Sequence, residues 1–490
     1  MEKSETGGRM IKFGTDGWRG IIADDFTVEK IKMVTSGVCK YLKLKTGGRK
    51  KCPTVVVGYD TRFMSDRFAK TVSSTLAANN VKTYISSNFI PTPALSVAVV
   101  KRSADLGIMI TASHNPYYYN GYKIKGSYGG SATPDIVAEI EDSVNQYIKG
   151  SSCPSCYADS NFNYDKNIIV EDFTTGYRKH VLSLVDLDAV KNFNFKVLID
   201  PMYGAAQNLY RDMLEAISPG KIIEIHSVLN PAFGGINPEP IGDNLNDAVS
   251  AIKKEKCALC ICLDGDGDRV AALGEDGNFI SSHHIFAVLL SHIVKNKKPA
   301  GKVVKTVSTS SVIDKICSKY GLELVTTPIG FKYISDEILK GGVVIGGEES
   351  GGLWEEGNIP ERDGIFIGLK LIETMCKEGR TINNILEEIY NDFGYFVYRR
   401  LDYEISAVQK EKLKEMLSKR VPDILQTEGT REVVTIDGYK YVMDDGSWVM
   451  IRPSGTEAVV RIYAESDSEK KLNRLHNLGK KVVDSVMQKG

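Results

Sequence analysis

Short apolar runs recur along this chain and alternate with segments whose apolar residues are three or four positions apart. The short runs are typical of buried strands, and the wider spacing is typical of helices that bury one face. The alternation predicts an α/β fold with largely parallel sheets, because parallel strands are joined through helices. The predicted strands are residues 54–57, 106–110, 196–199, 258–263, 303–307 and 343–345.

One predicted helix has both a start signal and an apolar stripe. Thr133 stands where an N-cap residue is expected, and Pro134 occupies the first helical position, where a missing N–H is harmless. The apolar residues that follow are four positions apart, which places them on one helix face. They are Ile136, Ile140, Val144 and Ile148.

The last hundred residues have a different character. Strand-like segments at 433–436, 448–451 and 459–464 follow a charged helical pattern and precede a closing helix. Ser466 and Glu469 have the spacing of a capping box at the start of that helix. The region is predicted to form a smaller α+β domain.

Three changes in composition predict domain boundaries. A polar linker covers about residues 150–168, a second boundary lies near Gly277, and a third lies near residues 393–398. The expected domains are three α/β domains followed by the α+β domain, at residues 1–155, 165–277, 278–393 and 398–490.

Composition narrows the classes of partner. The 490 residues carry a formal net charge of +0 and are 42% hydrophobic, so nothing favours nucleic acid or an anionic membrane as partner. No apolar stretch is long enough to span a membrane, and the first residues lack the apolar core of a signal peptide. We expect a cytoplasmic protein. A net charge of zero is also compatible with a local basic pocket that binds a small anion.

Three carboxylates follow the predicted strand at 258–263. Asp264, Asp266 and Asp268 alternate with glycines, and in an extended segment such side chains point to one side. Converging carboxylate oxygens suit Mg²⁺. A calcium-binding EF-hand is excluded, because Arg269 stands where that loop needs glycine. Arg269 is better explained as a partner for phosphate oxygens.

A polar loop at residues 111–116 follows the predicted strand at 106–110. Ligands of open α/β sheets bind at the carboxyl ends of strands. The loop contains Ser113, whose hydroxyl needs help to act as a nucleophile. His114 adjoins it and Lys123 lies ten residues further on. Taken alone, the loop is equally compatible with an ordinary polar turn.

Two further glycine-bearing loops carry polar groups. Residues 347–352 read Gly-Glu-Glu-Ser-Gly-Gly, and paired carboxylates beside a hydroxyl suit sugar hydroxyls, although an acidic surface turn has the same composition. Residues 452–457 read Arg-Pro-Ser-Gly-Thr-Glu, which supplies the parts of a phosphate cradle or simply a turn. Arg19 lies in a third glycine-rich segment near the N-terminus.

Together these four motifs resemble, in order, those of the α-D-phosphohexomutase superfamily, and the resemblance covers almost the whole chain. It implies three related α/β domains and a smaller fourth around a central cleft. It also implies an isomerase that moves phosphate between the 1 and 6 positions of a hexose phosphate. Ser113 would carry the phosphate, and Mg²⁺ and a hexose 1,6-bisphosphate would be required.

The resemblance assigns roles to individual residues. Ser113 and the three aspartates would hold the metal. Lys123 would be the general acid/base, which requires a lowered pKa. Arg19, Arg269, His114 and Lys332 resemble further catalytic residues. Substrate would be bound by sugar-contacting and phosphate-contacting residues, namely Glu348, Ser350, Arg452, Ser454, Gly455 and Thr456.

The identity of the sugar rests on a finer comparison. The Gly-Glu-Glu-Ser loop is similar to the phosphoglucomutase form, whereas phosphoglucosamine mutases usually have Gly-Glu-Gln-Ser-Gly-His and dual glucose/mannose enzymes often have Gly-Glu-Met-Ser-Gly-His. This chain has Gly352 in place of that histidine, and Ala458 where many members have proline. Glucose phosphate is favoured and mannose phosphate is the close alternative.

The protein is expected to be a monomer or a homodimer.

Two other classes of function are compatible with parts of the pattern. One is a sugar-bisphosphate sensor without catalytic activity, against which the completeness of the motifs argues. The other is a phosphatase or an aspartyl-phosphate mutase with Asp264 as nucleophile. That class typically has Asp-x-Asp followed by Thr or Val, whereas this chain has Asp268.

Overall fold

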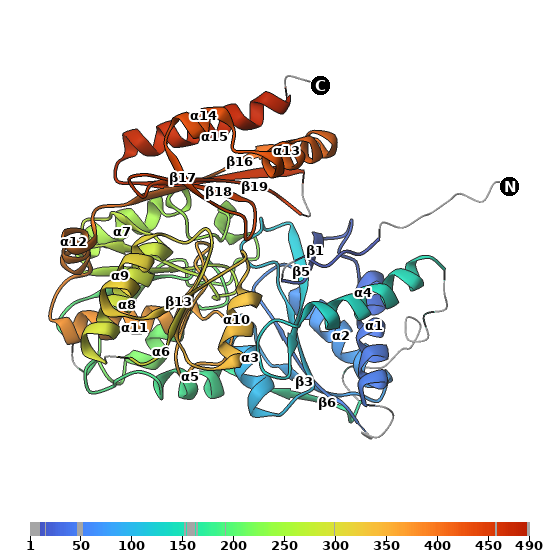
Figure 1. Ribbon diagram of the computed structural model, residues 1–490. Helices are drawn as coiled ribbons and strands as arrows, with labels where there is room; N and C mark the ends of the chain where they lie inside the picture. Colours follow the sequence, from blue (N-terminus) through green and yellow to red (C-terminus); the bar gives the residue numbers. More distant parts are fainter. Residues whose placement is uncertain are drawn as a thin grey trace. The chain divides into compact units, whose positions relative to one another are not determined.

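The computed structural model describes residues 10–14, 16–46, 52–150, 153, 162, 165–191, 193–297, 299–455 and 458–487 (Figure 1). The chain forms two compact units. The first consists of Met1–Ile285, Ser335–Gly341 and Ser350–Ile382. The second consists of Phe286–Ile334, Gly342–Glu349 and Asn383–Gly490.

The first unit opens with a six-stranded sheet in the order β1-β5-β4-β2-β3-β6. β2 pairs in parallel with β3 and β4, whereas β5 is antiparallel to β4 and to β1. Helices α1, α2 and α4 share one apolar core on this sheet, and α3 packs against β2 and β4. The bounds are β1 Trp18–Ile21, α1 Val28–Thr46, β2 Thr54–Tyr59, α2 Ser65–Ala78, β3 Lys82–Ser86, α3 Thr92–Lys101, β4 Leu106–Ile110, β5 Tyr119–Gly126, α4 Pro134–Ile148 and β6 Ile168–Glu171.

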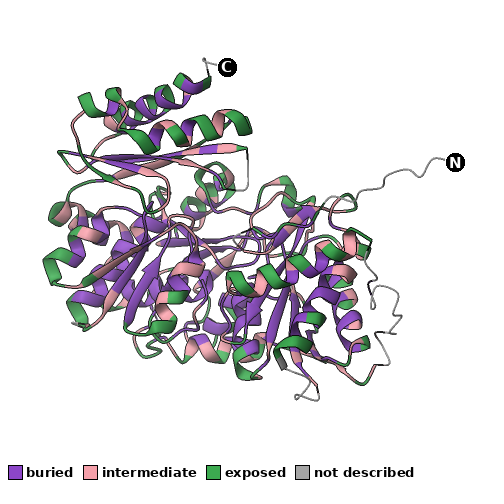
Figure 2. Ribbon diagram, turned by 45° about the vertical axis from the view of Figure 1, so that its right-hand side comes forward, coloured by how far each residue is buried: buried purple, intermediate pink, exposed green. Residues whose placement is uncertain are grey.

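A second sheet of this unit has the order β11-β10-β9-β7-β8. β7 is parallel to β8 and β9, and β9 turns back into antiparallel β10. The strands in its centre are buried on both faces (Figure 2). The bounds are α5 Thr174–Leu182, β7 Val197–Asp200, α6 Leu209–Leu214, β8 Ile222–Glu224, η1 Phe233–Gly235, η2 Gly242–Asn244, α7 Asn246–Glu255, β9 Leu259–Leu263, β10 Val270–Gly274, β11 Phe279–Ile280, β15 Leu353–Glu355 and α11 Gly364–Glu378.

The second unit contains parallel strands and a separate antiparallel sheet. β12 lies between β13 and β14 and is parallel to both. The antiparallel sheet has the order β16-β20-β19-β18-β17. The bounds are α8 Ser282–Asn296, β12 Lys302–Thr306, α9 Val312–Tyr320, β13 Glu323–Thr327, α10 Phe331–Lys340, β14 Val343–Gly347, α12 Ile382–Phe393, β16 Val397–Glu404, α13 Ala407–Lys419, α14 Asp423–Thr427, β17 Thr430–Val434, β18 Tyr439–Met443, β19 Trp448–Pro453, β20 Val459–Ser466 and α15 Glu469–Met487.

The last sheet has two different faces. Residues of α13, α14 and α15 join one face in an apolar core. Trp448, Met450 and Tyr463 point to the opposite face, where they pack with Val307 from the end of β12. Directly opposed residues of antiparallel strands share a face, so Arg400 and Arg461 lie on this second face as well. This face therefore carries aromatic side chains and arginines, together with the carboxylates of Asp402 and Glu465.

The predicted fold class and strands agree with the structure. The six strands predicted before residue 350 overlap observed ones within two residues at each end, and so do those predicted at 448–451 and 459–464. The segment predicted at 433–436 begins three residues after the start of β17. Helix α4 begins at Pro134 after an extended Thr133, whose side chain makes no capping bond. The predicted capping box at Ser466 is wrong. Ser466 is the last residue of β20 and donates its hydroxyl hydrogen to the backbone oxygen of Ser468, while α15 begins only at Glu469.

No helix in the described part of the chain has both the length and the apolar composition needed to cross a membrane.

Gly368 of α11 allows close packing, and replacing it by alanine is expected to destabilise the first unit. An added Cβ would collide with the hydroxyl of Tyr210 and lie 2.9 Å from Ile261. Alanine gains about 1 kcal/mol of helix propensity, but overpacking a core costs about 1–3 kcal/mol. We expect a lower melting temperature by calorimetry. The matched control is Gly176→Ala in α5, where the nearest atom lies 3.9 Å away, and it should not destabilise.

Candidate active site

Ser113 lies in the turn between β4 and β5 with a left-handed backbone, φ 54°. Its side chain is fully buried, and its Oγ donates a hydrogen bond to Asp264 at 2.8 Å. The backbone N–H of Ser113 donates to Thr111 Oγ1 at 2.9 Å. A left-handed backbone is uncommon outside glycine and marks a constrained position. The loop therefore fixes this hydroxyl against the acidic segment of the second sheet.

The three aspartates converge, but for a different reason than predicted. Residues 264–269 form a tight turn between β9 and β10 rather than an extended segment, with Gly267 at φ 70°. Asp264 Oδ1 accepts hydrogen bonds from the backbone N–H groups of Asp268 and Arg269 at 3.0 and 3.1 Å. One ligand atom from each of Asp264, Asp266 and Asp268 lies within 4.8 Å of the others. The turn, not strand alternation, gathers the carboxylates.

The donor set of these aspartates fits a divalent cation. All three side chains are fully buried, and Oδ1 of Asp266 and Oδ1 of Asp268 have no hydrogen-bond partner among the described residues. Burial and the two neighbouring aspartates raise the pKa of Asp264 well above its usual range, which reflects the concentration of negative charge. Buried carboxylate oxygens without partners are unfavourable unless a cation binds them.

Lys123 of β5 places its ammonium among carboxylates, only 1% exposed. Its Nζ lies 2.8 Å from Asp16, 2.8 Å from Asp266 and 3.1 Å from Asp268. Burial disfavours the charged form, but these three carboxylates outweigh it and raise the pKa of Lys123. The prediction of a lowered pKa is wrong for this arrangement, because the nearest neighbours are acidic rather than basic.

Three residues that the sequence did not single out complete this cluster. Arg362 Nη2 lies 2.7 Å from both Asp16 and Asp268, so it links the N-terminal segment to the acidic turn. Thr92, the first residue of α3, donates its hydroxyl hydrogen to Asp266 at 2.5 Å. Asp16 lies within the glycine-rich segment around Arg19, so the sequence could have indicated Asp16 as a site residue through that segment. Nothing local in the sequence marks Thr92 or Arg362.

The remaining predicted catalytic residues of this unit surround Ser113. His114 Nδ1 lies 3.3 Å from Ser113 Oγ. Burial together with Arg269, Arg19 and Lys123 lowers the pKa of His114 well below its usual range. Arg19 Nη1 donates to Asn115 Oδ1 at 2.5 Å. Arg269 directs its guanidinium toward Asp264, with Nε 4.0 Å from the carboxylate.

The acidic loop after β14 is divided between the two units. Glu348 and Glu349 belong to the second unit and Ser350 to the first. Glu348 is buried, whereas Glu349 is half-buried and accepts hydrogen bonds from the hydroxyl groups of Ser308 at 2.6 Å and Thr306 at 3.3 Å. Hydroxyl groups of Thr306 and Ser308, at the end of β12, thus orient Glu349, the second of the paired carboxylates.

The predicted phosphate-binding residues lie at the end of β19. Arg452 Nε lies 2.8 Å from Asp437, which also accepts the backbone N–H of Ile329 at 3.0 Å. Ser454 is buried and its backbone N–H donates to Val459 at 2.8 Å, while Gly455 is exposed with no atom near its Cβ position. Thr456 lies outside the described residues.

Lys332 lies in the second unit at the start of α10, with its Nζ 5.0 Å from the centre of the Tyr333 ring. The structure therefore gathers Ser113, His114, Lys123, Arg19, Arg269 and the aspartates within one unit. It places Lys332, Glu348, Arg452, Ser454 and Gly455 in the other.

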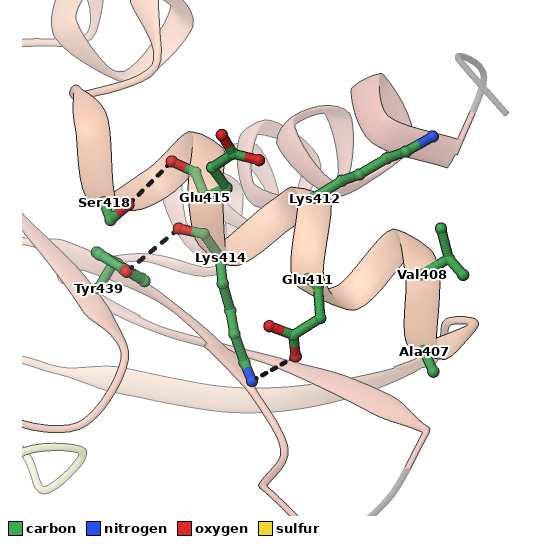
Figure 3. Close-up of a pocket in the computed structure, with 8 residues that line it drawn as sticks. All are labelled: Ala407, Val408, Glu411, Lys412, Lys414, Glu415, Ser418 and Tyr439. Atoms are coloured by element: carbon green, nitrogen blue, oxygen red, sulfur yellow. Dashed lines mark hydrogen bonds and ion pairs between the residues drawn. The ribbon is translucent and has the colours of Figure 1, made fainter.

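A surface groove of about 800 Å³ lies elsewhere, along α13 and Tyr439 (Figure 3). Its polar groups are engaged with one another: Lys414 pairs with Glu411 at 2.8 Å, and Tyr439 donates to the Lys414 backbone oxygen at 3.4 Å. It contains neither a convergent carboxylate cluster nor a buried nucleophile. The groove is not a candidate for the chemistry.

Family models match most of the chain. Those described as phosphoglucomutase/phosphomannomutase alpha/beta/alpha domains I, II and III match residues 10–150, 175–277 and 281–393, and the one described as the C-terminal domain matches residues 406–477.

Relatives are similar over nearly their full length. A phosphoglucomutase/phosphomannomutase of Thermococcus kodakarensis is 28% identical, covering 97% of this chain and 99% of the relative. A phosphoglucosamine/phosphogalactosamine mutase of Sulfurisphaera tokodaii is 30% identical, covering 96% and 99%. A crystal structure from Thermus thermophilus, assigned as a phosphomannomutase, superimposes with a TM-score of 0.83 at 30% identity, covering 97% and 99%.

Proposed function

Because the chain belongs to the phosphoglucomutase/phosphomannomutase family of α-D-phosphohexomutases, which are isomerases, we propose that it interconverts glucose 1-phosphate and glucose 6-phosphate. The observation that carries this proposal is the contact between Ser113 Oγ and Asp264 at 2.8 Å, within a buried group of three carboxylates. We also propose the domain bounds 1–155, 165–277, 278–393 and 398–490.

The proposed reaction has two phosphoryl transfers. In the first, the bond between phosphorus and Ser113 Oγ breaks while a bond forms to the free hydroxyl oxygen of the hexose phosphate. The resulting 1,6-bisphosphate turns over, and its other phosphoryl group returns to Ser113 Oγ. In the first transfer the proton of the attacking sugar hydroxyl passes to Ser113 Oγ. In the second, the Ser113 hydroxyl attacks, the bond between phosphorus and the sugar oxygen breaks, and the serine proton passes to that oxygen. Such transfers depend on positioning and on stabilising negative charge.

Residues of the first unit supply both requirements. Asp264, Asp266 and Asp268 would hold Mg²⁺, which when bound supplies positive charge to the oxygens of the serine phosphate. The ammonium of Lys123, now paired with Asp266, and the guanidinium of Arg269, which lies 4.0 Å from Asp264, would donate to the same oxygens. Lys123 would act as the general acid/base.

The second unit carries groups suited to hold the sugar and its other phosphate. Glu348 and Glu349 would accept hydrogen bonds from sugar hydroxyls, and Glu349 is oriented by Ser308. Arg452 and Ser454 would bind the phosphate that does not react. Because this phosphate occupies either end of the sugar in alternate half-reactions, one phosphate-binding loop can serve both directions.

A parallel assay identifies the sugar. Glucose 1-phosphate, mannose 1-phosphate and glucosamine 1-phosphate are offered separately with Mg²⁺ and a trace of the matching 1,6-bisphosphate. We expect kcat/KM to be about 10-fold higher for glucose, because misplacing one hydrogen-bonded hydroxyl costs about 1–3 kcal/mol. A reversed order would replace glucose by the preferred sugar. Turnover of none of the three would overturn the proposed function.

A further inference from the structure

Arg62, in the turn between β2 and α2, lies beneath the serine loop and is 3% exposed. Its guanidinium donates to four backbone carbonyl oxygens of that loop. Nη2 lies 2.6 Å from the oxygen of Ser113 and 2.6 Å from that of Asn115. Nη1 lies 2.8 Å from the oxygen of Pro116 and 3.1 Å from that of Tyr119. One side chain thus binds four backbone carbonyls between Ser113 and Tyr119.

Asp60 fixes the guanidinium from the other side. Its Oδ2 accepts from Arg62 Nε at 3.1 Å and from Thr111 Oγ1 at 2.6 Å. Thr111 Oγ1 in turn accepts the backbone N–H of Ser113. The carbonyl oxygen of Ser113 therefore accepts from Arg62, and its N–H donates to Thr111. Arg62 and Thr111 both donate to the buried carboxylate of Asp60. Such a closed network specifies one loop geometry.

The Ser113 carbonyl is closely approached by the acidic turn. A Cβ added to Gly265 of the acidic turn would lie 2.5 Å from this oxygen, so the two backbones are already in close approach. The guanidinium of Arg62 also lies 4.9 Å from the centre of the buried Phe233 ring, in the second sheet's part of the chain. Thr61 donates to the backbone oxygen of Tyr203 at 2.9 Å. Residues 60–62 thus contact both the serine loop and the part that carries the aspartates.

We propose that Arg62 is a positioning residue for phosphoryl transfer: it sets the distance and direction of the Ser113 hydroxyl relative to the aspartates, without touching substrate. This inference rests on the proposed function for its catalytic consequence. The guanidinium of Arg62 bonds to the backbone of the serine loop and to Asp60, so its loss should affect the chemical step and not the binding of sugar phosphate.

The test compares Arg62→Lys with Arg67→Lys, an exposed arginine on α2. Lysine keeps the charge but lacks the planar fork that reaches four carbonyls. A displacement of about 1 Å can cost about 10²-fold in rate. We expect kcat of Arg62→Lys to fall about 10²-fold while KM stays within about 3-fold, and Arg67→Lys to match the wild type. An unchanged kcat, or a loss seen only in KM, would overturn the proposal.

Hydrogen exchange measures the positioning without any turnover. The backbone N–H groups of Ser113 and Tyr119 donate within the loop and that of Thr111 donates to Gly121 of β5, so all three should exchange slowly. In Arg62→Lys the peptide covering residues 111–119 should exchange at least about 10-fold faster, whereas strand β2 should be unchanged. Faster exchange with normal kcat would show that the loop tolerates misplacement and would overturn the catalytic role. An inactive wild type would refute the proposed function while leaving the exchange result interpretable.

Thr111→Val provides a second variant if Arg62→Lys does not fold. It removes the acceptor of the Ser113 N–H while keeping the shape of the side chain, and it leaves Arg62 in place. We expect kcat to fall by about 10-fold, less than in Arg62→Lys, with KM again retained, because the bond from Arg62 to the Ser113 carbonyl remains. A loss of kcat/KM that comes only from a higher KM, with kcat unchanged, would contradict the positioning role.

Discussion

Turnover should fall by at least about 10⁴-fold when Ser113 is replaced by alanine, because the residue supplies the oxygen that accepts and returns the phosphoryl group. No other hydroxyl is described within hydrogen-bonding distance of Asp264. The measurement is kcat/KM in the coupled assay, together with the intact mass after incubation with glucose 1,6-bisphosphate. The wild type should gain one phosphate group and Ser113→Ala none.

The control for this substitution is Ser127→Ala, an exposed serine in the turn after β5. It removes the same atom and should leave both activity and phosphate content unchanged. Retention of more than about a hundredth of wild-type activity in Ser113→Ala would place the nucleophile elsewhere. Acid-labile phosphate on Asp264 would then identify the aspartyl-phosphate alternative.

Loss of one acidic ligand should be nearly as severe. Asp266→Asn keeps the volume of the side chain but replaces one of its oxygens by an NH₂ group that cannot coordinate a cation. Charge stabilisation by a metal is worth several kcal/mol, so we expect kcat to fall about 10³-fold. Chelation of divalent cations from the wild type should have a similar effect, reversed by added Mg²⁺.

A melting curve tests the ligand set independently of activity. Binding to the folded state stabilises by about 2.7 kcal/mol when Mg²⁺ is at a hundred times its Kd. The wild type and the exposed control Asp24→Asn should show a higher melting temperature with Mg²⁺, and Asp266→Asn should show little or no shift. An undiminished shift in Asp266→Asn would mean that Mg²⁺ binds elsewhere.

The sequence predicted those parts of the site that depend on local pattern. β4 and β9 are continuous apolar runs, and the polar residues that follow them were assigned to strand ends, where the structure has them. The convergence of the aspartates was anticipated with the wrong geometry, because an Asp/Gly run is compatible with both an extended segment and a turn. The backbone bonds to Asp264 Oδ1, which favour the turn, depend on φ and ψ values that composition does not specify.

Long-range contacts account for what the sequence did not predict. Asp16 and Arg362 lie 346 positions apart and meet only in the folded chain. The electrostatics of Lys123 depend on contacts of the same kind, because Asp16, Asp266 and Asp268 are distant in sequence but lie within 3.1 Å of its ammonium. Arg62 was missed for the same reason, since its partners are backbone oxygens that no motif displays.

The chain passes between the two compact units five times, at residues 285/286, 334/335, 341/342, 349/350 and 382/383. No single cut in the gene could therefore deliver the two units as separate polypeptides. The fourth passage falls within the acidic loop, between Glu349 and Ser350, so a nick there would sever the group suited to sugar hydroxyls rather than a neutral connector. Recombination within this family would consequently have to exchange whole chains or small elements, and a split-protein reporter would need its break at a surface turn inside one unit.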